Sequence, residues 1–371
     1  MNLVAQSLVR YLLDIGAIDH SSVVDGDLII TDSTRRHRNF KVQQARAPGC
    51  FVKQVQAGQA QADVSLHREA VCYWLVATDP HFAALRPLLP CYRSYDGAQQ
   101  ALVIELLPQS ENITEHHQRL GRFPIQVATL LGRELGRAHR DVSDPGPQAT
   151  GMQVFPRAVP WILSIHTVAA AQFDRLSAAN AQILGIVRQY PEFQSTLDAL
   201  RAQWTIGGLI HGDMKWDNCL VFGKSGEPGT LDLKIIDWEL ADFGDLAWDV
   251  GAIFQSYLSF WILSMPQHDE ASSEKLIEQA KYPLDAMQPA IHAFWRSYVD
   301  ARQLASPSES AMLQRCVQYA AARMIQTAYE HMSYAPKVSM STVRLLQVSI
   351  NVLTRPAEAI RDLLGMQEVR A

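Results

Sequence analysis

The sequence predicts an α+β fold with two lobes: a small N-terminal antiparallel β lobe with one key helix, and a larger, mostly helical C-terminal lobe. The chain has 371 residues, which is more than one compact core usually holds. Strand-like patterns fill roughly its first hundred residues, and helical spacing dominates the rest. The change falls at ELLPQS, so we expect an N-terminal nucleotide-binding lobe at 1–106 and a C-terminal lobe at 107–371.

The N-terminal lobe begins with a helical pattern and continues as strands. Five apolar residues recur on one helical face, namely Leu3, Val4, Leu8, Leu12 and Leu13. This spacing indicates a packed helix and not a signal peptide. Strand signals follow at residues 27–32, 39–44, 49–56, 91–97 and 101–108. A helix is expected at 65–78, between the third and fourth strands, with an apolar face formed by Leu66, Val71, Trp74 and Leu75.

The C-terminal lobe is expected to be helical apart from one hairpin. Residues 126–140 and 160–204 have helix-forming patterns, as does the region from about 246 onward, which prolines interrupt. Two short apolar runs between 217 and 237 predict a small β hairpin.

The bulk composition argues against several classes of protein. A net charge of -5 and a pI near 6.2 do not favour nucleic-acid binding, which usually leaves a basic surface. The five cysteines are widely spaced and form no CxxC pair, so we expect buried, reduced thiols in a cytoplasmic protein. No apolar run is long enough to span a bilayer, and no oligomeric state is specified.

A polar segment between two apolar runs, HGDMKWDN, points to phosphoryl transfer. That reaction needs a carboxylate to orient the attacking hydroxyl and ligands for the metal ions that neutralise the phosphates. Asp213 suits the first role, and Asn218, five positions later, suits the second. This spacing is the known one of protein-kinase catalytic loops. Asp237, at the end of the apolar strand in KIIDWE, offers a second metal-binding carboxylate.

Lys53 and Glu69 complete this set of residues. A lysine within an apolar strand is costly to bury without a partner, and Glu69 on the following helix is a plausible one. Each feature has an ordinary alternative: HGD as a turn, Lys53 as an edge lysine reaching water, and Asp237 as a cap. Their joint occurrence in this order favours the chemical interpretation.

These motifs make the chain similar to the aminoglycoside phosphotransferase and choline kinase family, the small-molecule branch of the protein-kinase-like fold. HGDMKWDN resembles that family's catalytic loop, IDWE stands where protein kinases have DFG, and the resemblance extends from about residue 25 to 260. It implies that Asp213 is the catalytic base and that Asn218 and Asp237 bind Mg²⁺. Lys53 with Glu69 would hold the phosphates of ATP or GTP.

The resemblance also implies supporting roles. The segment VIELLP would be the hinge between the lobes, with the carbonyl of Glu105 and the amide of Leu107 pairing with the adenine edge. Asp249 matches a buried aspartate that braces the catalytic loop through backbone amides, and His211 belongs to the same structural support.

The loop TDSTRRHRNF departs from the protein-kinase pattern because it has no glycine, which would let the backbone approach phosphate closely. Relatives of the aminoglycoside type often use a serine-containing loop, which implies that Ser33 or Thr34 donates a hydrogen bond to phosphate, and Arg35, Arg36 and Arg38 can add charge-assisted contacts. For any single arginine a solvated basic turn is the alternative. A contact with an acidic acceptor or with a peptide leader is a third interpretation.

Lys215 is a second departure. Serine/threonine protein kinases have a lysine two places after the catalytic aspartate, so Lys215 is a candidate catalytic residue and is also compatible with a Ser or Thr acceptor. Trp248 follows Asp237 by only eleven positions, so the long activation segment of protein kinases is absent. This spacing argues against a regulated signalling kinase.

Acidic residues near the two motifs have two interpretations. Asp217, Glu239 and Asp242 are candidate contacts for a cationic acceptor, or they cap helices and brace loops. Other polar and aromatic residues receive no site role. His116, His117 and His139 are interpreted as surface or capping residues, and the helically spaced Phe254, Tyr257, Phe260 and Trp261 as core.

The sequence therefore predicts a kinase that moves the γ-phosphate of ATP or GTP, with Mg²⁺, to a hydroxyl of a small molecule such as an aminoglycoside or amino alcohol. The first alternative is a kinase for Ser or Thr of a peptide, as in a lanthipeptide-type pathway. The second is a nucleotide-binding pseudokinase scaffold, which the glycine-free loop favours and the intact set of five residues disfavours. The expected partners are the nucleotide and the acceptor, with neither nucleic acid nor membrane.

Overall fold

The computed structural model describes residues 5–33, 38–55, 60–167, 176–224, 226–227, 229–267 and 272–366. The chain divides into two compact units. Unit 1 consists of Met1–Asn112, Pro145–Pro156 and Asn218–Ala241, and unit 2 consists of Ile113–Asp144, Arg157–Asp217 and Asp242–Ala371. Unit 1 is built on an antiparallel sheet and unit 2 is mostly helical, so the predicted α+β class is confirmed.

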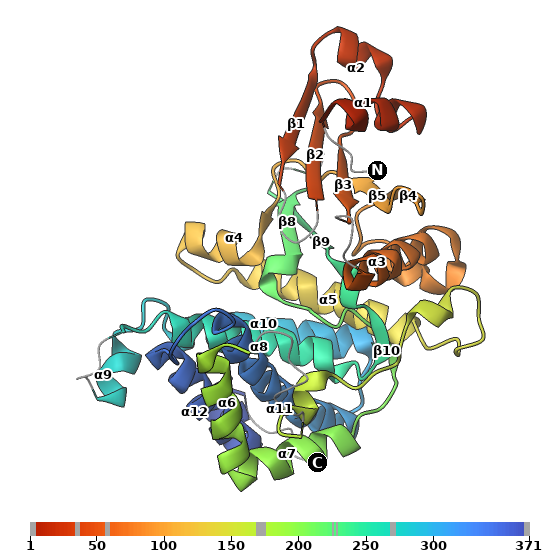
Figure 1. Cartoon of the computed structure of the whole chain (residues 1–371). Helices are drawn as coiled ribbons and strands as arrows, with labels where there is room; N and C mark the ends of the chain where they lie inside the picture. Colours follow the sequence, from red (N-terminus) through yellow and green to blue (C-terminus); the bar gives the residue numbers. More distant parts are fainter. Residues whose placement is uncertain are drawn as a thin grey trace. The chain divides into compact units, whose positions relative to one another are not determined.

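Unit 1 contains the predicted five-stranded antiparallel sheet, with the strand order β1-β2-β3-β5-β4 (Figure 1). Its strands are β1 (Leu28–Asp32), β2 (Arg38–Gln44), β3 (Cys50–Gln54), β4 (Tyr92–Asp96) and β5 (Ala101–Glu105). The predicted helix between the third and fourth strands is α3 (Ala60–Thr78). Because β3 is the central strand, Lys53 is flanked by Asn39 on β2 and Leu102 on β5.

The N-terminal helix α1 (Ala5–Asp14) packs on this sheet as predicted. Leu8 and Leu12 are fully buried in one cluster with Val42 and Val52 of the sheet. Burying a leucine side chain contributes about 1.5–3 kcal/mol, which is enough to hold a short helix in place. Leu3 and Val4 lie outside the described residues. Two further short helices of unit 1 are α2 (His20–Val24) and the 3₁₀ helix η1 (Pro80–Leu85).

The buried face of α3 differs in part from the prediction. Leu66 and Leu75 are buried as expected, but Trp74 is 38% exposed and does not belong to the core. The buried stripe instead includes Glu69 and Tyr73, which follow Leu66 at helical spacing. A carboxylate therefore occupies a position that the apolar pattern alone would have left to a hydrophobic residue.

The predicted hairpin near residues 217–237 is present in unit 1. It consists of β8 (Cys219–Gly223) and β9 (Leu231–Ile235), and the short strand β6 (Glu111–Asn112) pairs with β8. Cys219 pairs with Ile235, and the amide of Ile236 donates to the carbonyl of Asn218 at 2.9 Å. Asn218 and Asp237 therefore flank the same open end of this hairpin.

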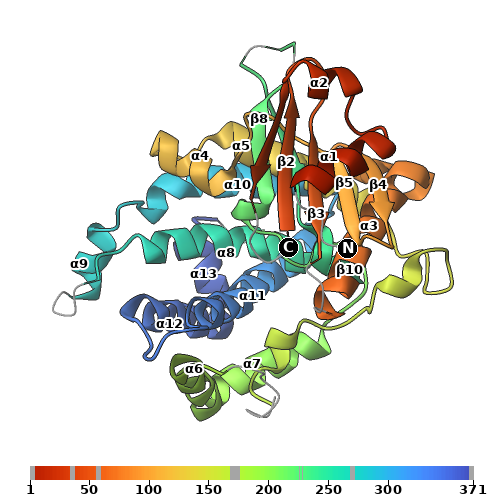
Figure 2. The same ribbon diagram turned by 45° about the horizontal axis from the view of Figure 1, so that its top comes forward.

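Unit 2 is a bundle of helices with one pair of very short strands. The helices are α4 (Ile113–Leu120), α5 (Ile125–Asp141), α6 (Ala178–Gln189), α7 (Pro191–Ala202), α8 (Ala247–Leu263), α9 (Ser273–Glu278), α10 (Leu284–Arg302), α11 (Ser306–His331), α12 (Met340–Thr354) and α13 (Pro356–Asp362). The strands are β7 (Gly208–Ile210) and β10 (Asp242–Gly244), which pair antiparallel. Figure 2 shows α8, α11 and α12 side by side in this unit.

Close helix contacts in unit 2 depend on glycine. A Cβ atom at Gly251 of α8 would lie 2.6 Å from the carbonyl oxygen of Cys316 on α11, which is too close for any side chain. Gly136 of α5 meets the carbonyl of Tyr298 on α10 at the same 2.6 Å. The first contact fixes α11 against α8, the helix whose Asp249 binds the predicted catalytic loop, and the second fixes α5 against α10.

The remaining expectations about the core are largely met. Phe254, Tyr257 and Trp261 of α8 are buried, as expected for core residues. All five cysteines are unpaired, and Cys91 alone among them is exposed. Within the described part of the chain, the helices are too short or too polar to cross a membrane.

Candidate active site

Lys53 lies at the centre of a buried ion-pair cluster in unit 1. Its Nζ donates to both carboxylate oxygens of Glu69, at 2.7 and 2.9 Å, and to Oδ1 of Asp237 at 2.7 Å. The Lys53 side chain is 7% exposed and that of Glu69 is 0% exposed, so the pair is shielded from water. Strand β3, helix α3 and the segment that follows β9 each supply one member.

Electrostatics keep this lysine charged. Burial by itself lowers the pKa of Lys53, but the carboxylates of Glu69 and Asp237 outweigh burial and raise it above the ordinary lysine value. The cluster is therefore a fixed ammonium ion with one fully buried anion and one more accessible anion. The Asp237 side chain is 38% exposed, so it is the member that solvent reaches.

Asp237 has an unusual backbone conformation. Its φ of 69° and ψ of 51° lie in the left-handed region, which costs a residue other than glycine about 1–3 kcal/mol. The chain turns there from β9 into the 3₁₀ helix η6 (Trp238–Leu240). Local strain at an aspartate that faces a buried lysine is the pattern expected where function fixes a side-chain direction.

Asn218 ends the 3₁₀ helix η5 (Trp216–Asn218) and is buried, with 6% exposure. Unit 1 thus brings together Lys53, Glu69, Asp237 and Asn218, which are the residues predicted to hold phosphate and metal. The described residues contain no group of three or more His, Cys, Asp and Glu side chains arranged to bind a metal ion.

Glu239 also belongs to unit 1 and packs against α3. Ser65 donates to Oε2 of Glu239 at 3.1 Å, and Arg68 donates to the Glu239 carbonyl at 3.4 Å. The residue is 9% exposed. These bonds favour a role in joining the segment after β9 to α3 over direct contact with an acceptor.

The predicted phosphate and adenine contacts are only partly described. The amide of Ser33 donates to the carbonyl of Asn39 at 2.8 Å, next to the paired residues Asp32 of β1 and Phe40 of β2. Thr34, Arg35 and Arg36 lie outside the described residues. Arg38 begins β2.

The hinge residues are located at the end of β5. Glu105 is the last residue of that strand, and its carboxylate accepts the amide of Cys91 at 3.0 Å. Leu107 follows two positions later, and its carbonyl accepts the hydroxyl of Ser110 at 3.0 Å. The contacts predicted for adenine involve other backbone atoms and stay a prediction.

The predicted catalytic loop in unit 2 follows β7 and is held by Asp249 of α8. The carboxylate of Asp249 accepts the amide of His211 at 2.6 Å and the amide of Gly212 at 3.1 Å. Nδ1 of His211 accepts the amide of Asp213 at 3.2 Å. Gly212 has a φ of 80°, a left-handed turn that directs the chain from the strand into the loop.

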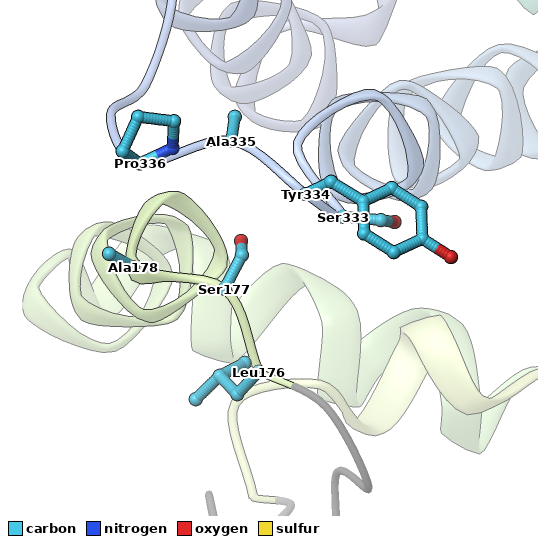
Figure 3. A pocket seen from close by; sticks show the side chains of 7 residues that line it. All are labelled: Leu176, Ser177, Ala178, Ser333, Tyr334, Ala335 and Pro336. Carbon is cyan, nitrogen blue, oxygen red and sulfur yellow. The ribbon is translucent and has the colours of Figure 1, made fainter.

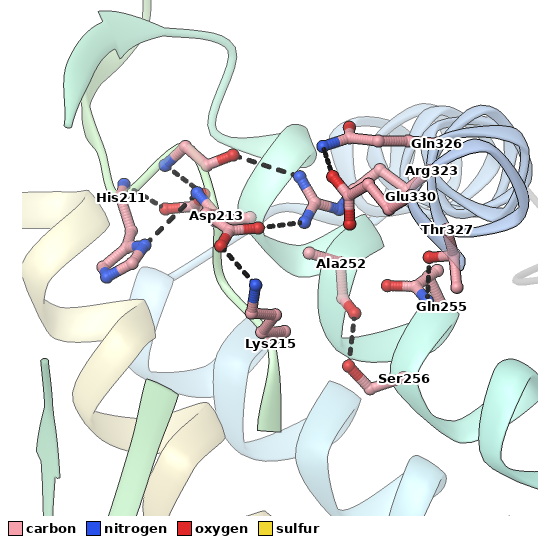
Figure 4. A network of polar contacts seen from close by, with 12 residues as sticks. His211, Asp213, Lys215, Ala252, Gln255, Ser256, Arg323, Gln326, Thr327 and Glu330 are labelled. Atoms are coloured by element: carbon pink, nitrogen blue, oxygen red, sulfur yellow. Dashed lines mark hydrogen bonds and ion pairs between the residues drawn. The ribbon is translucent and has the colours of Figure 1, made fainter. Parts of the chain in front are cut away.

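The carboxylate of Asp213 lies between two cations (Figure 4). Its Oδ1 accepts Nη2 of Arg323 at 3.0 Å, and its Oδ2 lies 2.7 Å from Nζ of Lys215. Burial raises the pKa of Asp213, but Arg323 and Lys215 together outweigh that effect and lower it below the ordinary aspartate value. Asp213 is thus held as a carboxylate, the state that a proton acceptor requires.

Arg323 is the site residue that sequence reasoning missed. It lies on α11 in the Ala-rich segment YAAARMIQTA, 110 positions after Asp213. The only signal was an arginine in an otherwise apolar stretch of helix, which the structure buries to 4% exposure. Such a residue is rarely buried without a charged partner.

The two remaining acidic candidates in unit 2 have different surroundings. Asp217 is exposed. Asp242 is buried, and its two oxygens accept the amides of Arg157 at 2.7 Å and Ala158 at 2.9 Å. Asp242 is therefore occupied with bracing a loop, the second of the two interpretations that the sequence allowed.

The interpretation of three histidines as surface or capping residues was wrong about their burial. His116, His117 and His139 are all buried and not at the surface. His117 packs edge-on against Trp216 with ring centroids 4.5 Å apart, and burial lowers its pKa to about 3. It is a neutral core residue because it lies among aromatic rings, which its short polar helix did not reveal.

One cavity of about 370 Å³ lies elsewhere in unit 2, between the start of α6 and the loop after α11 (Figure 3). Ser177 and Tyr334 are among its lining residues. The Ser177 hydroxyl donates to the carbonyl of Met332 and accepts the amide of Asn180, so it caps α6. None of the predicted site residues lines this cavity.

The family to which the chain belongs makes it a phosphotransferase. A model of the phosphotransferase enzyme family matches residues 31–282, which is more than half of the chain. The chain belongs to this family, and the predicted family and kinase class are confirmed. No curated protein matches the sequence.

Solved structures show the same fold at low sequence identity. Amicoumacin kinase hAmiN, in complex with AMP-PNP, Ca²⁺ and Ami, is 12% identical with a TM-score of 0.52, covering 93% of this chain and 96% of that one. The streptomycin-ATP-APH(2″)-IIa ternary complex is 11% identical with a TM-score of 0.51, covering 95% and 99%. A choline kinase from Cryptosporidium parvum Iowa II is 12% identical with a TM-score of 0.50, covering 95% and 96%.

Proposed function

We propose that the protein transfers the γ-phosphate of ATP or GTP to a hydroxyl group of a small molecule, such as an aminoglycoside or an amino alcohol, with Mg²⁺. The observation that supports this most directly is the buried Lys53, which is paired at once with Glu69 and with the more exposed Asp237. A buried, permanently charged lysine beside an accessible carboxylate suits a polyphosphate and its metal ion.

The donor residues suit Mg²⁺. Asn218 and Asp237 offer one amide oxygen and one carboxylate, hard oxygen ligands of the kind this ion prefers. Mg²⁺ usually takes only one or two protein carboxylates and completes its shell with water and phosphate, so a small protein ligand set is sufficient. When bound, the ion supplies positive charge against the phosphate oxygens. Lys53 then orients the α- and β-phosphates.

Asp213 serves as the base in this proposal. The acceptor hydroxyl oxygen forms a bond to the γ-phosphorus, the bond from that phosphorus to the bridging oxygen breaks, and the nucleoside diphosphate leaves. The hydroxyl proton passes to the Asp213 carboxylate. Lys215, 2.7 Å from Oδ2, supplies positive charge on the acceptor side of this step.

A small-molecule acceptor is supported by the similar structures, which are an amicoumacin kinase, a choline kinase and a complex of APH(2″)-IIa with streptomycin and ATP. The exposed carboxylates of Asp217 and Glu330 offer partners for a cationic substrate. Glu330 acts electrostatically on Lys215, so it lies on the same side as the proposed acceptor.

An acceptor screen tests the proposal. The full chain is incubated with Mg²⁺ and ATP or GTP, and with streptomycin, choline, ethanolamine or Ser/Thr peptides, and products are detected by mass gain. We expect a phosphorylated small molecule from the unmodified enzyme and a loss of about 10²–10⁴-fold for Asp213→Asn. Asp198→Asn, a half-exposed aspartate on α7 paired with Arg201 and His166, is the control and should retain activity.

Two results would contradict the proposal. Unimpaired transfer by Asp213→Asn would remove the assigned base. Phosphopeptide as the sole product would establish the peptide-kinase alternative, and nucleotide binding without turnover on any acceptor would favour the scaffold.

A further inference from the structure

Arg323 connects the helical core of unit 2 to the carboxylate of Asp213. We propose that Arg323 is the positioning residue of the base: it fixes Oδ1 of Asp213, so that Oδ2 is the atom that receives the acceptor's proton. This inference rests on the proposed role of Asp213 as base. It adds a residue from α11, outside the matched family segment of residues 31–282, to the catalytic apparatus.

The two carboxylate oxygens of Asp213 have different surroundings. Oδ1 faces Arg323, whose side chain is 4% exposed, and Oδ2 faces Lys215, whose side chain is 39% exposed. An acceptor in solution can therefore approach from the side of Oδ2 and Lys215. The guanidinium keeps its protons at all working pH values, so a proton arriving at Asp213 goes to the other oxygen.

Arg323 is itself held rigidly. Its Nη1 donates to the carbonyl of Gly212 at 3.0 Å while Nη2 donates to Asp213, so one planar group spans two consecutive residues of the loop. The guanidinium lies 5.0 Å above the ring of Trp248, and the indole nitrogen of Trp248 donates to the same Gly212 carbonyl at 2.9 Å. Arginine alone has the flat, forked set of donors that this geometry needs.

The helix that presents Arg323 is anchored independently. Two turns earlier on α11, Nε of Arg315 lies 3.0 Å from Oδ2 of Asp245, and the hydroxyl of Tyr319 donates to the same oxygen at 3.2 Å. Helix α11 thus carries two arginines that each pair with an aspartate outside the helix: Arg315 with Asp245 and Arg323 with Asp213. Only the second touches the catalytic loop, which makes the first a matched control.

The titratable groups around Asp213 come from three elements. Arg323 comes from α11, Lys215 and His211 from the loop itself, and Asp249 of α8 binds the backbone of His211 and Gly212. Arg323 and Lys215 both lower the pKa of Asp213. Loss of Arg323 therefore raises that pKa while Lys215 still contacts Oδ2.

The test compares Arg323→Lys and Arg323→Gln with Arg315→Gln and Asp213→Asn in the full chain. The assays use MgATP with the acceptor identified by the screen above, or with water as acceptor and phosphate release as the readout. For Arg323→Gln we expect kcat to fall about 100-fold, since a misplaced catalytic group costs that much. KM for ATP should change less than about 2-fold, and Arg323→Lys should restore little, because a single ammonium cannot span Gly212 and Asp213.

A pH profile separates positioning from general damage to the fold. The acid limb of kcat/KM should move to higher pH in Arg323→Gln and stay in place in Arg315→Gln, whatever each variant costs in thermal stability. An unchanged kcat and an unchanged acid limb in a folded Arg323→Gln would overturn the inference. If Asp213→Asn were fully active, or the unmodified enzyme inactive with every acceptor, the proposed function would fail, and this inference with it.

Discussion

Burying the charged side chain of Lys53 costs free energy, and this cost indicates a functional role for the residue. A charged side chain at 7% exposure is stable only when paired, and its partner Glu69 is completely buried. Removing Lys53 therefore leaves Glu69 uncompensated, whereas replacing both by apolar residues leaves no buried charge at this point. The pair is better explained by its chemistry than by stability, because well-packed hydrophobic residues of similar size would do as well or better.

We expect Lys53→Met to lower the free energy of unfolding by about 3–5 kcal/mol, because Glu69 is left buried without a counter-ion. The double variant Lys53→Met/Glu69→Leu should recover most of that loss. Urea titrations of the unmodified chain, both single variants and the double variant measure these values. Lys224→Met, which breaks the exposed pair with Glu227, is the control and should cost less than about 1 kcal/mol. A double variant less stable than Lys53→Met would contradict this account.

Among single residues, the sequence predicted those whose proposed partners lie close to them in the chain. Asp213 and Asn218 belong to one short motif, and Lys53 and Glu69 are only 16 positions apart. Arg323 could not be predicted, because its contact with Asp213 depends on how α8 and α11 pack and on the glycine that lets them approach. His117 was misjudged for a similar reason, since its aromatic neighbours come from distant segments.

Among the elements, β7 and β10 are very short, and β7 leads directly into the predicted catalytic loop. Each has three residues, and Gly208 pairs with Gly244 across them. Their brevity hid them from sequence analysis, because three residues give no measurable alternation. The longer elements were predictable: five strands, α3 and the β8–β9 hairpin all follow from period and turn signals.

Gly208→Ala should weaken the strand pair that supports the catalytic loop. A Cβ atom at this position would lie 2.5 Å from the carbonyl oxygen of Val142, so the backbone must shift. We expect a loss of about 1–3 kcal/mol in unfolding free energy and a reduced kcat. Gly185→Ala, on α6 with no atom within 4 Å, is the matched control and should leave stability equal or slightly higher. Equal effects of the two substitutions would argue against the importance of this contact.

In the whole molecule, the predicted site residues are divided between the two units. Unit 1 collects three separate stretches of chain, and the stretch Asn218–Ala241 supplies both predicted metal ligands. Unit 2 holds Asp213, Lys215 and their supports. The predicted division at 106/107 was a single boundary. It therefore did not include the two later stretches of chain that belong to unit 1.

Nucleotide and metal should stabilise the molecule through Asp237. We expect MgATP at about 100 times its Kd to add roughly 2.7 kcal/mol to stability, seen as a higher melting temperature. Asp237→Asn should lose most of this shift, and EDTA should lose the part that depends on metal. Asparagine tolerates the left-handed backbone of this position, so the substitution removes charge and not conformation. A full shift in Asp237→Asn would exclude this residue as a metal ligand.

The contact between Asp213 and Arg323 joins residues 110 positions apart, and this has a consequence for how the enzyme comes into being. During translation the catalytic loop leaves the ribosome long before α11 does. A nascent or truncated chain ending before Arg323 has the loop and its motif but lacks the cation that holds the aspartate. Truncated chains that end before Arg323 should therefore have no phosphotransferase activity. Activity should appear only late in synthesis, after the C-terminal helices have packed into unit 2.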